Sequence, residues 1–247
     1  MSVKKFLNHK LWLNALFSVL LTNALTAQSL LDDGPNSSGS ENYIQFIAPQ
    51  KAVPIARVGG GIRGTEGSDI VFSVLAPEQI GLTTQAQPTL YWYQSVPAEN
   101  MEFELTLNLK DETILEHKLS QASNSGIQKL DLTASDISLE PEKNYEWIIA
   151  LIPDANDRAK DITSSTLIRR VLPNDALTEE LRKTSAEQHA YIYAKAGIWY
   201  DALASLENTI EAVSDDEKLK LDRVKLFEQV GLEKVAEFEK QSLATEN

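Results

Sequence analysis

Three glycines in the stretch RVGGGIRG (57–64) have the spacing of a dinucleotide-binding loop. Gly59, Gly61 and Gly64 fit the letters G-x-G-x-x-G, in which glycines let the backbone approach a pyrophosphate at the start of a helix. That chemistry needs an apolar strand before the glycines and a helix after them. Two prolines interrupt the preceding residues, and the following TEGSDIVFSVLAP indicates a turn and then a strand. We therefore predict a structural role, a tight backbone path before the first core strand, with carboxylate partners for the two arginines.

The residue types that most often carry catalysis or bind metals form no recognisable site. Glu102 and Glu104 are predicted to lie on the exposed face of an alternating strand. The loop DANDRAKD (154–161) lacks the glycine and the terminal glutamate of a calcium loop, so weak calcium binding is only a minor alternative. Cysteine and G-x-S-x-G are absent, and His117 and His189 have no nearby metal-ligand partners. We predict no catalytic residue, cofactor or metal, and an unrecognised hydrolase remains a lesser alternative.

The aromatic run TLYWYQS offers the candidate binding residues. Tyr91 and Tyr93 point to one face of the predicted strand, and Trp92 points to the other. In one interpretation, one face packs in the core and the other is covered by the N-terminal segment or by the helices. In the other interpretation, Tyr91, Trp92 and Tyr93 form a platform for a sugar or an extended peptide.

The N-terminus indicates export from the cell. Three lysines precede an apolar run at 11–25, and small residues follow up to Ala27, which is typical of a signal peptide over residues 1–27. A permanent membrane anchor is the alternative. The net charge of −13 and the pI of about 4.7 disfavour nucleic acid and anionic membranes as partners. We predict a periplasmic or extracellular protein without a membrane span after cleavage.

Residues 28–56 are predicted to be a flexible linker, and residues 57–173 a β domain. Small polar residues predict disorder to about residue 42, followed by a loosely docked strand at 43–47. Short β-branched and aromatic runs without helical periodicity then predict an antiparallel sandwich of the immunoglobulin or fibronectin type. Tyr145, six residues after Leu139, matches the tyrosine corner of such sandwiches.

After Pro173 the periodicity changes, and residues 174–247 are predicted to form a helical tail. An aromatic residue, a glycine and an alanine recur 34 residues apart, which resembles the tetratricopeptide repeat. These residues are Tyr193, Gly197 and Ala202, then Phe227, Gly231 and Ala236. The pattern covers about one and a half units, fewer than the roughly three needed for independent stability. The tail is therefore expected to pack on the sandwich or on a partner.

Four motifs occur in an order typical of one bacterial exported family: RVGGGIRG, LAPEQIGLT with the following QPTLYWYQ, LEPEKNYEWIIAL and YAKAGIWYDALASL. From about Arg57 to Leu206, the chain resembles the family called domain of unknown function 928. The resemblance implies no established reaction, cofactor or catalytic residue. Members are often encoded near sensor proteins and secreted adhesin-like proteins, which implies a partner in the cell envelope.

These observations together predict a non-enzymatic interaction module. The expected partner is a protein or peptide of the envelope. The alternative is a carbohydrate-binding module that uses Tyr91, Trp92 or Tyr93, with a glycan as its partner.

Overall fold

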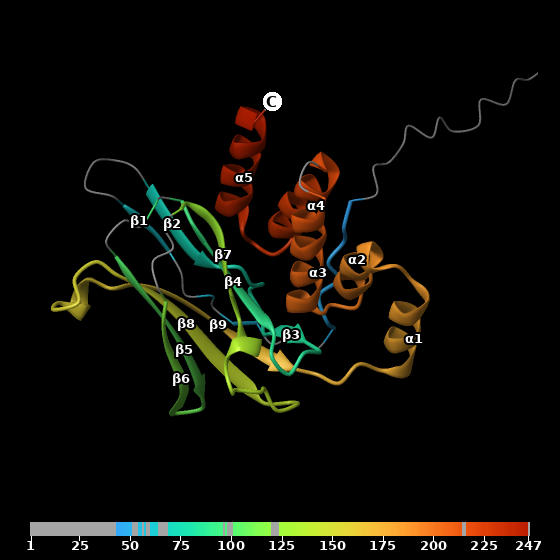
Figure 1. The fold of residues 1–247 in the computed structure, drawn as a ribbon, viewed down its shortest axis with the longest axis horizontal. Coiled ribbons are helices and arrows are strands. Elements are labelled where there is room, and N and C mark those ends of the chain that lie inside the picture. The colour runs from blue at the N-terminus through green and yellow to red at the C-terminus, as the bar shows by residue number, and fades with distance from the viewer. Residues whose placement is uncertain are drawn as a thin grey trace, which may run out of the picture. The chain divides into compact units, whose positions relative to one another are not determined.

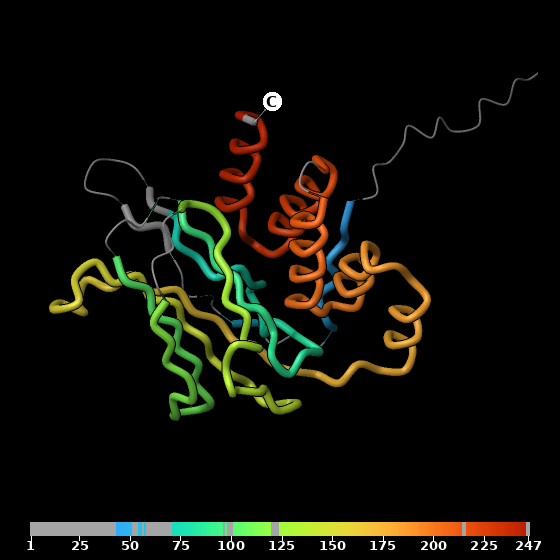
Figure 2. Tube along the Cα trace, viewed as in Figure 1, coloured from blue at the N-terminus to red at the C-terminus, as the bar shows by residue number. Residues whose placement is uncertain are grey.

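The computed structural model describes most of the chain after residue 42 (Figures 1 and 2). The chain divides into two compact units, residues 1–41 and 42–247, and the described residues all belong to the second. The predicted signal peptide, Gly59 and Gly64 lie outside the described residues. The described residues are 43–50, 54–55, 57, 60–63, 69–95, 97, 101–119, 124–213 and 216–246.

The strands that the structure describes form two sheets. The first sheet is antiparallel and contains, in spatial order, β1 (Gly60–Arg63), β2 (Asp69–Val74), β4 (Thr89–Gln94) and β7 (Gly126–Asp131). The second sheet contains, in spatial order, β3 (Gly81–Thr83), β9 (Ile162–Arg170), β8 (Asn144–Ile152), β5 (Glu102–Leu109) and β6 (Glu112–Leu119). Short 3₁₀ turns follow β7 at Leu132–Ala134 and precede β9 at Arg158–Lys160.

The two sheets pack their apolar faces together. Phe103 of β5 lies 6.2 Å from the ring centre of Phe72 and 6.5 Å from that of Trp92, and all three are almost fully buried. The alternation predicted in β5 follows from this packing, since every second side chain faces the opposite sheet.

The prediction of purely antiparallel pairing is wrong for β3, which runs parallel to β9. A hairpin forces neighbouring strands to run antiparallel, whereas a pair joined by a long crossover is free of that constraint. Strands β4 to β8 all lie between β3 and β9 in the sequence.

Among the described residues, five helices follow the strands: α1 (Asp175–Lys183), α2 (Ala186–Lys195), α3 (Trp199–Ala212), α4 (Glu217–Glu228) and α5 (Glu233–Glu246). The turns between α2 and α3 and between α4 and α5 each contain a glycine at φ +75°, Gly197 and Gly231. Positive φ after a helix favours glycine because it has no Cβ. The other four residues of the recurring pattern are buried or half-buried: Tyr193, Ala202, Phe227 and Ala236. None of the described helices is long and apolar enough to cross a membrane.

Helix α3 packs directly on the strands, so the helical tail contacts the β domain of its own chain. The indole Nε1 of Trp199 donates to the carbonyl of Leu75 at 2.8 Å, and the indole of Trp147 in β8 donates to the hydroxyl of Tyr200 at 2.8 Å. A Cβ on Gly81 would lie 2.6 Å from the ring of Tyr200, so β3 and α3 approach closely because this position is glycine.

Candidate functional site

The helices hold an extended segment of the protein's own chain, residues 43–49, which Figure 1 shows in blue beside α2, α3 and α4. The amide of Ile44 donates to Oδ1 of Asp222 at 2.8 Å. The side-chain amide of Gln229 makes two bonds to the segment, donating to the carbonyl of Ile44 and accepting from the amide of Phe46, each at 2.9 Å. The segment is not the loosely docked strand that we predicted, because its backbone bonds to helix side chains.

Its contacts continue toward α2 and α3. The amide of Ile47 donates to the carbonyl of Ala194 at 3.0 Å. Ile44 is 1% exposed, and the ring of Phe46 packs edge-on against Trp199 with centroids 5.3 Å apart. The helical surface therefore contacts the segment through both its backbone and its alternate side chains.

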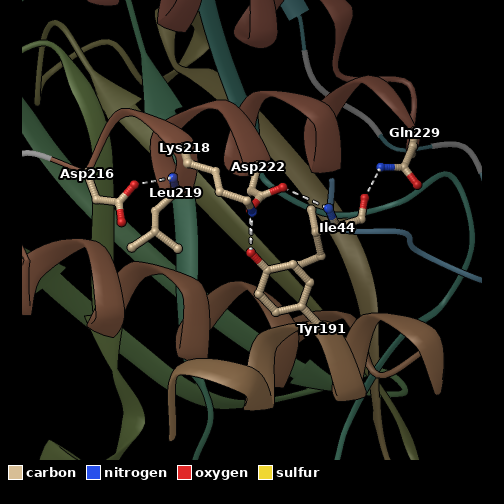
Figure 3. A network of polar contacts seen from close by, with 7 residues as sticks. All are labelled: Ile44, Tyr191, Asp216, Lys218, Leu219, Asp222 and Gln229. Carbon is tan, nitrogen blue, oxygen red and sulfur yellow. Dashed lines mark hydrogen bonds and ion pairs between the residues drawn. The ribbon is translucent and has the colours of Figure 1, made fainter. Parts of the chain in front are cut away.

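Asp222 is the central residue of this network, which Figure 3 shows. Its side chain is fully buried, and its other oxygen accepts from the hydroxyl of Tyr191 and from Nζ of Lys218, the latter at 2.7 Å. Burial lowers the pKa of Lys218, but its bonds to Asp222 and Tyr191 raise it more, so the net pKa lies above the ordinary value. The lysine thus stays charged at neutral pH and compensates the buried carboxylate.

Gly197 brings the segment close to the turn after α2. A Cβ at this position would lie 2.7 Å from the carbonyl oxygen of Ile47 and 3.0 Å from the ring of Pro49. The glycine of the recurring pattern therefore allows a backbone contact with residues 43–49 as well as the positive φ of the helix turn.

The sequence-based interpretation missed Asp222 and Gln229. One signal was present: Leu219, Asp222 and Leu226 have the i, i+3, i+7 spacing of one helix face, and all three are buried. A carboxylate in the middle of an apolar face needs a buried partner. Nothing comparable marks Gln229, whose partners lie more than 180 positions away in the sequence.

Arg57 fixes the backbone that follows the segment. Its guanidinium donates to the carbonyl of Ala76 at 2.7 Å, to that of Val230 at 3.3 Å, and to that of Gly231. The last two carbonyls follow α4, where the helix dipole favours a cation. The predicted carboxylate partner is more distant, with Glu78 at 4.0 Å, and burial lowers the pKa of Arg57.

The glycine-rich stretch contributes an edge strand. Gly61 lies in β1 opposite Val71 of β2, so a strand occupies part of the stretch that we predicted to be a path before the first strand. Arg63 ends β1 opposite Asp69. The next described element is β2, which pairs with β1 in the antiparallel direction. The β-branched residues after the glycines favour this strand.

The three candidate aromatic residues are buried. Tyr91, Trp92 and Tyr93 are 2%, 2% and 5% exposed. Trp92 packs between the sheets against Phe103, and the ring of Tyr93 lies 6.1 Å from that of Phe238 in α5. Burial raises the pKa of Tyr93 to about 12. Strand β4 therefore presents no exposed ring face, and the helices supply the cover that one of our two interpretations expected.

A buried ion cluster lies between the helices and the first sheet. The guanidinium of Arg223 in α4 contacts Glu207 of α3 at 3.2 Å and also Glu239 of α5. These residues and Tyr91 line a cavity of about 300 Å³. Burial raises the pKa of Glu207 despite the nearby arginine. The cluster connects three helices, and no sequence motif identified it.

A second cavity, of about 250 Å³, lies between the β3–β4 connection and helices α2 and α3. Asp201 lines it and is 4% exposed. Its carboxylate accepts from the hydroxyl of Thr83 at 2.7 Å and from the amide of Thr84 at 3.0 Å. His189 also lines the cavity, with Nε2 3.0 Å from the carbonyl of Leu181. Asp201 and His189 therefore each have a hydrogen-bond partner within the protein.

The exposed face predicted for β5 is only partly exposed. Glu102 faces solvent, whereas Glu104 is 8% exposed and pairs with Arg158 at 2.9 Å. Arg158 comes from the loop 154–161 and also binds Asp161 at 2.6 Å. The prediction for Glu104 is wrong because a loop distant in sequence covers it. Within the described residues, no group of three His, Cys, Asp or Glu side chains is arranged to hold a metal.

Tyr145 lies at the start of β8, where its hydroxyl accepts a hydrogen bond from the backbone amide of Glu140 at 3.0 Å.

A family model described as Domain of Unknown Function (DUF928) matches residues 58–239. The chain belongs to the DUF928 family. No curated protein matches it. The DUF928 match runs from β1 into α5 and includes Asp222 and Gln229, whereas residues 43–49 precede it.

Proposed function

We propose that this DUF928 protein is an exported, non-enzymatic binding module of the cell envelope, which holds an extended segment of a partner protein on its helices. The observation that carries the proposal is the contact between residues 43–49 and α2–α4, made largely through backbone atoms. A surface that binds one extended segment through its backbone has the chemistry to bind another.

The finer architecture that we propose is consistent with this function. The bond from the amide of Glu140 to Tyr145 supports an immunoglobulin- or fibronectin-like sandwich. The matching turns at Gly197 and Gly231, 34 residues apart, support tetratricopeptide-like helix pairs. Stacked repeats of this kind offer extended binding surfaces.

Export and the choice of partner rest on the sequence. The basic, apolar and small-residue segments of residues 1–27 support cleavage of a signal peptide and residence in the periplasm or outside the cell. The acidic net charge of −13 supports a protein or peptide partner over nucleic acid. The burial of Tyr91, Trp92 and Tyr93 favours this function over a glycan platform on β4.

Site-specific crosslinking tests the proposal. A photo-crosslinking residue at Lys195, an exposed position next to Ala194 on α2, should capture an envelope protein in cells. The control carries the crosslinker at Glu116, an exposed position on the edge strand β6. We expect a partner captured at Lys195 and not at Glu116, and an intact mass for the exported chain that corresponds to a start at Gln28. Equal capture at both positions, or none at Lys195, would contradict the proposal.

A further inference from the structure

We propose that residues 43–49 act as an internal ligand that competes with the partner for one groove. By this groove we mean the surface that contacts residues 43–49, formed by Ala194 of α2, Trp199 of α3, and Asp222 and Gln229 of α4. The partner we infer is an extended peptide with an aliphatic residue followed, two positions later, by an aromatic one. This inference rests on the proposed function, because it names the kind of partner segment and how its access is controlled.

Backbone recognition makes the internal ligand replaceable. Asp222 and Gln229 together bind three backbone groups of the segment: the amide and carbonyl of Ile44 and the amide of Phe46. Every extended peptide without proline at these positions presents the same three groups at the same spacing. The carbonyl of Ala194 accepts a fourth backbone bond, which requires nothing specific of the side chain.

Alternate side chains supply the selectivity. Ile44 is buried, and Phe46 packs on Trp199, whereas Gln45 and Ile47 between and after them face solvent. A peptide in the same register therefore needs apolar groups at only two positions, two residues apart. Lys225 lies over the ring of Tyr43 at 5.8 Å, so an aromatic residue just before the aliphatic one adds a cation–π contact.

Burial of Asp222 favours exchange of occupants over an empty groove. Its Oδ1 accepts only from the amide of Ile44 among the bonds of the described residues, and an oxygen that loses its partner in a buried site is destabilised. An attached segment also has an effective concentration on the order of millimolar. A partner peptide must therefore bind tightly enough to displace residues 43–49, which sets a threshold for binding.

The test uses the whole exported chain and a fluorescent peptide with the sequence of residues 43–49, YIQFIAP. Ile44→Asp places a charge in the apolar site and weakens the internal segment without altering the groove. We expect this variant to bind the peptide at least about tenfold more tightly than the unaltered chain. Adding Gln229→Ala to it should weaken binding by about tenfold, because two backbone bonds are lost. Gln45→Ala, at an exposed neighbouring position, should change nothing.

If Ile44→Asp prevents folding, hydrogen exchange on the unaltered chain takes its place. Added peptide should then speed exchange at the amides of Ile44, Phe46 and Ile47. No peptide binding to a folded Ile44→Asp chain would overturn the inference even if crosslinking finds an envelope partner. Peptide binding without any envelope partner would support the inference and contradict the proposed function. A concentration-dependent dimer that Ile44→Asp abolishes would overturn it in favour of segment exchange between copies.

Discussion

The carboxyl group of Glu207 is subject to opposing effects of burial and of a nearby cation. Burial raises its pKa above the ordinary value of 4.5, and the guanidinium of Arg223 at 3.2 Å lowers it by less. A carboxyl group whose folded-state pKa is raised stabilises the fold fully below its unfolded pKa. That stabilisation is lost as the pH rises through the folded-state pKa. Glu207 is thus predicted to weaken the fold as the pH rises above its ordinary pKa of 4.5.

Glu207→Gln should remove this loss, because the neutral amide still accepts from Arg223 while Glu239 balances the guanidinium charge. We expect the free energy of unfolding of the variant, relative to the unaltered chain, to increase by about 1 kcal/mol between pH 5 and pH 7.5. Urea unfolding at the two pH values measures this. Glu211→Gln, which breaks the exposed pair with Lys129, should shift stability by less than about 1 kcal/mol. Parallel pH profiles of the Glu207 variant and the unaltered chain would contradict the assignment.

At the scale of elements, the two helix pairs have the same turn in different surroundings. Gly197 and Gly231 both have φ +75°, which disfavours any residue with a Cβ. A Cβ on Gly197 would meet the backbone oxygen of Ile47, whereas a Cβ on Gly231 would meet the side chain of Glu78 at 3.1 Å. The side chain of Glu78 is 69% exposed and can move aside, but the backbone of residues 43–49 cannot without losing its bonds.

Alanine at the two glycines should therefore have unequal effects. Gly231→Ala is expected to lower the free energy of unfolding by about 1 kcal/mol from the backbone conformation alone. Gly197→Ala should lower it by about 2 to 4 kcal/mol, because steric overlap adds to the same strain. Amide exchange gives the sharper measurement. The amide of Ile47 should exchange faster in Gly197→Ala than in the unaltered chain, and its exchange rate should not change in Gly231→Ala. Equal exchange rates in the two variants would show that Gly197 does not support the segment.

Local sequence patterns predicted the strands and helices themselves better than they predicted which of them lie side by side. Alternation in β5 and the change of period after Pro173 follow from side-chain geometry along a few residues, so strands and helices were foreseeable. The pairing of β3 with β9, the cover over Glu104 and the groove at Asp222 depend on residues far apart in the sequence. Periodicity identifies which face is buried and does not identify what buries it.

At the scale of the whole molecule, buried polar bonds connect the helices to both sheets. Trp199 of α3 donates to the backbone just after β2, and Tyr200 accepts from Trp147 of β8. Both indoles are fully buried, so each bond satisfies a donor that has no access to water. Spacing alone predicted a tail that packs on the sandwich or on a partner and did not choose between them, because neighbouring aromatic residues in a helix do not reveal that they contact two different sheets.

This connection predicts that strands and helices unfold together. Tyr200→Phe keeps the ring and removes the acceptor, so the indole of Trp147 becomes a buried donor without a partner, which should lower the free energy of unfolding by about 1 to 3 kcal/mol. Hydrogen exchange in β8 and in α3 should accelerate by the same factor, because one global opening exposes both. Tyr145→Phe, which frees only the backbone amide of Glu140 in a strand connection, tests a bond that α3 does not share. Faster exchange confined to α3 in Tyr200→Phe would mean that the helices open independently of the strands. The groove that holds residues 43–49 would then be stable only while the helices are packed on the sheets.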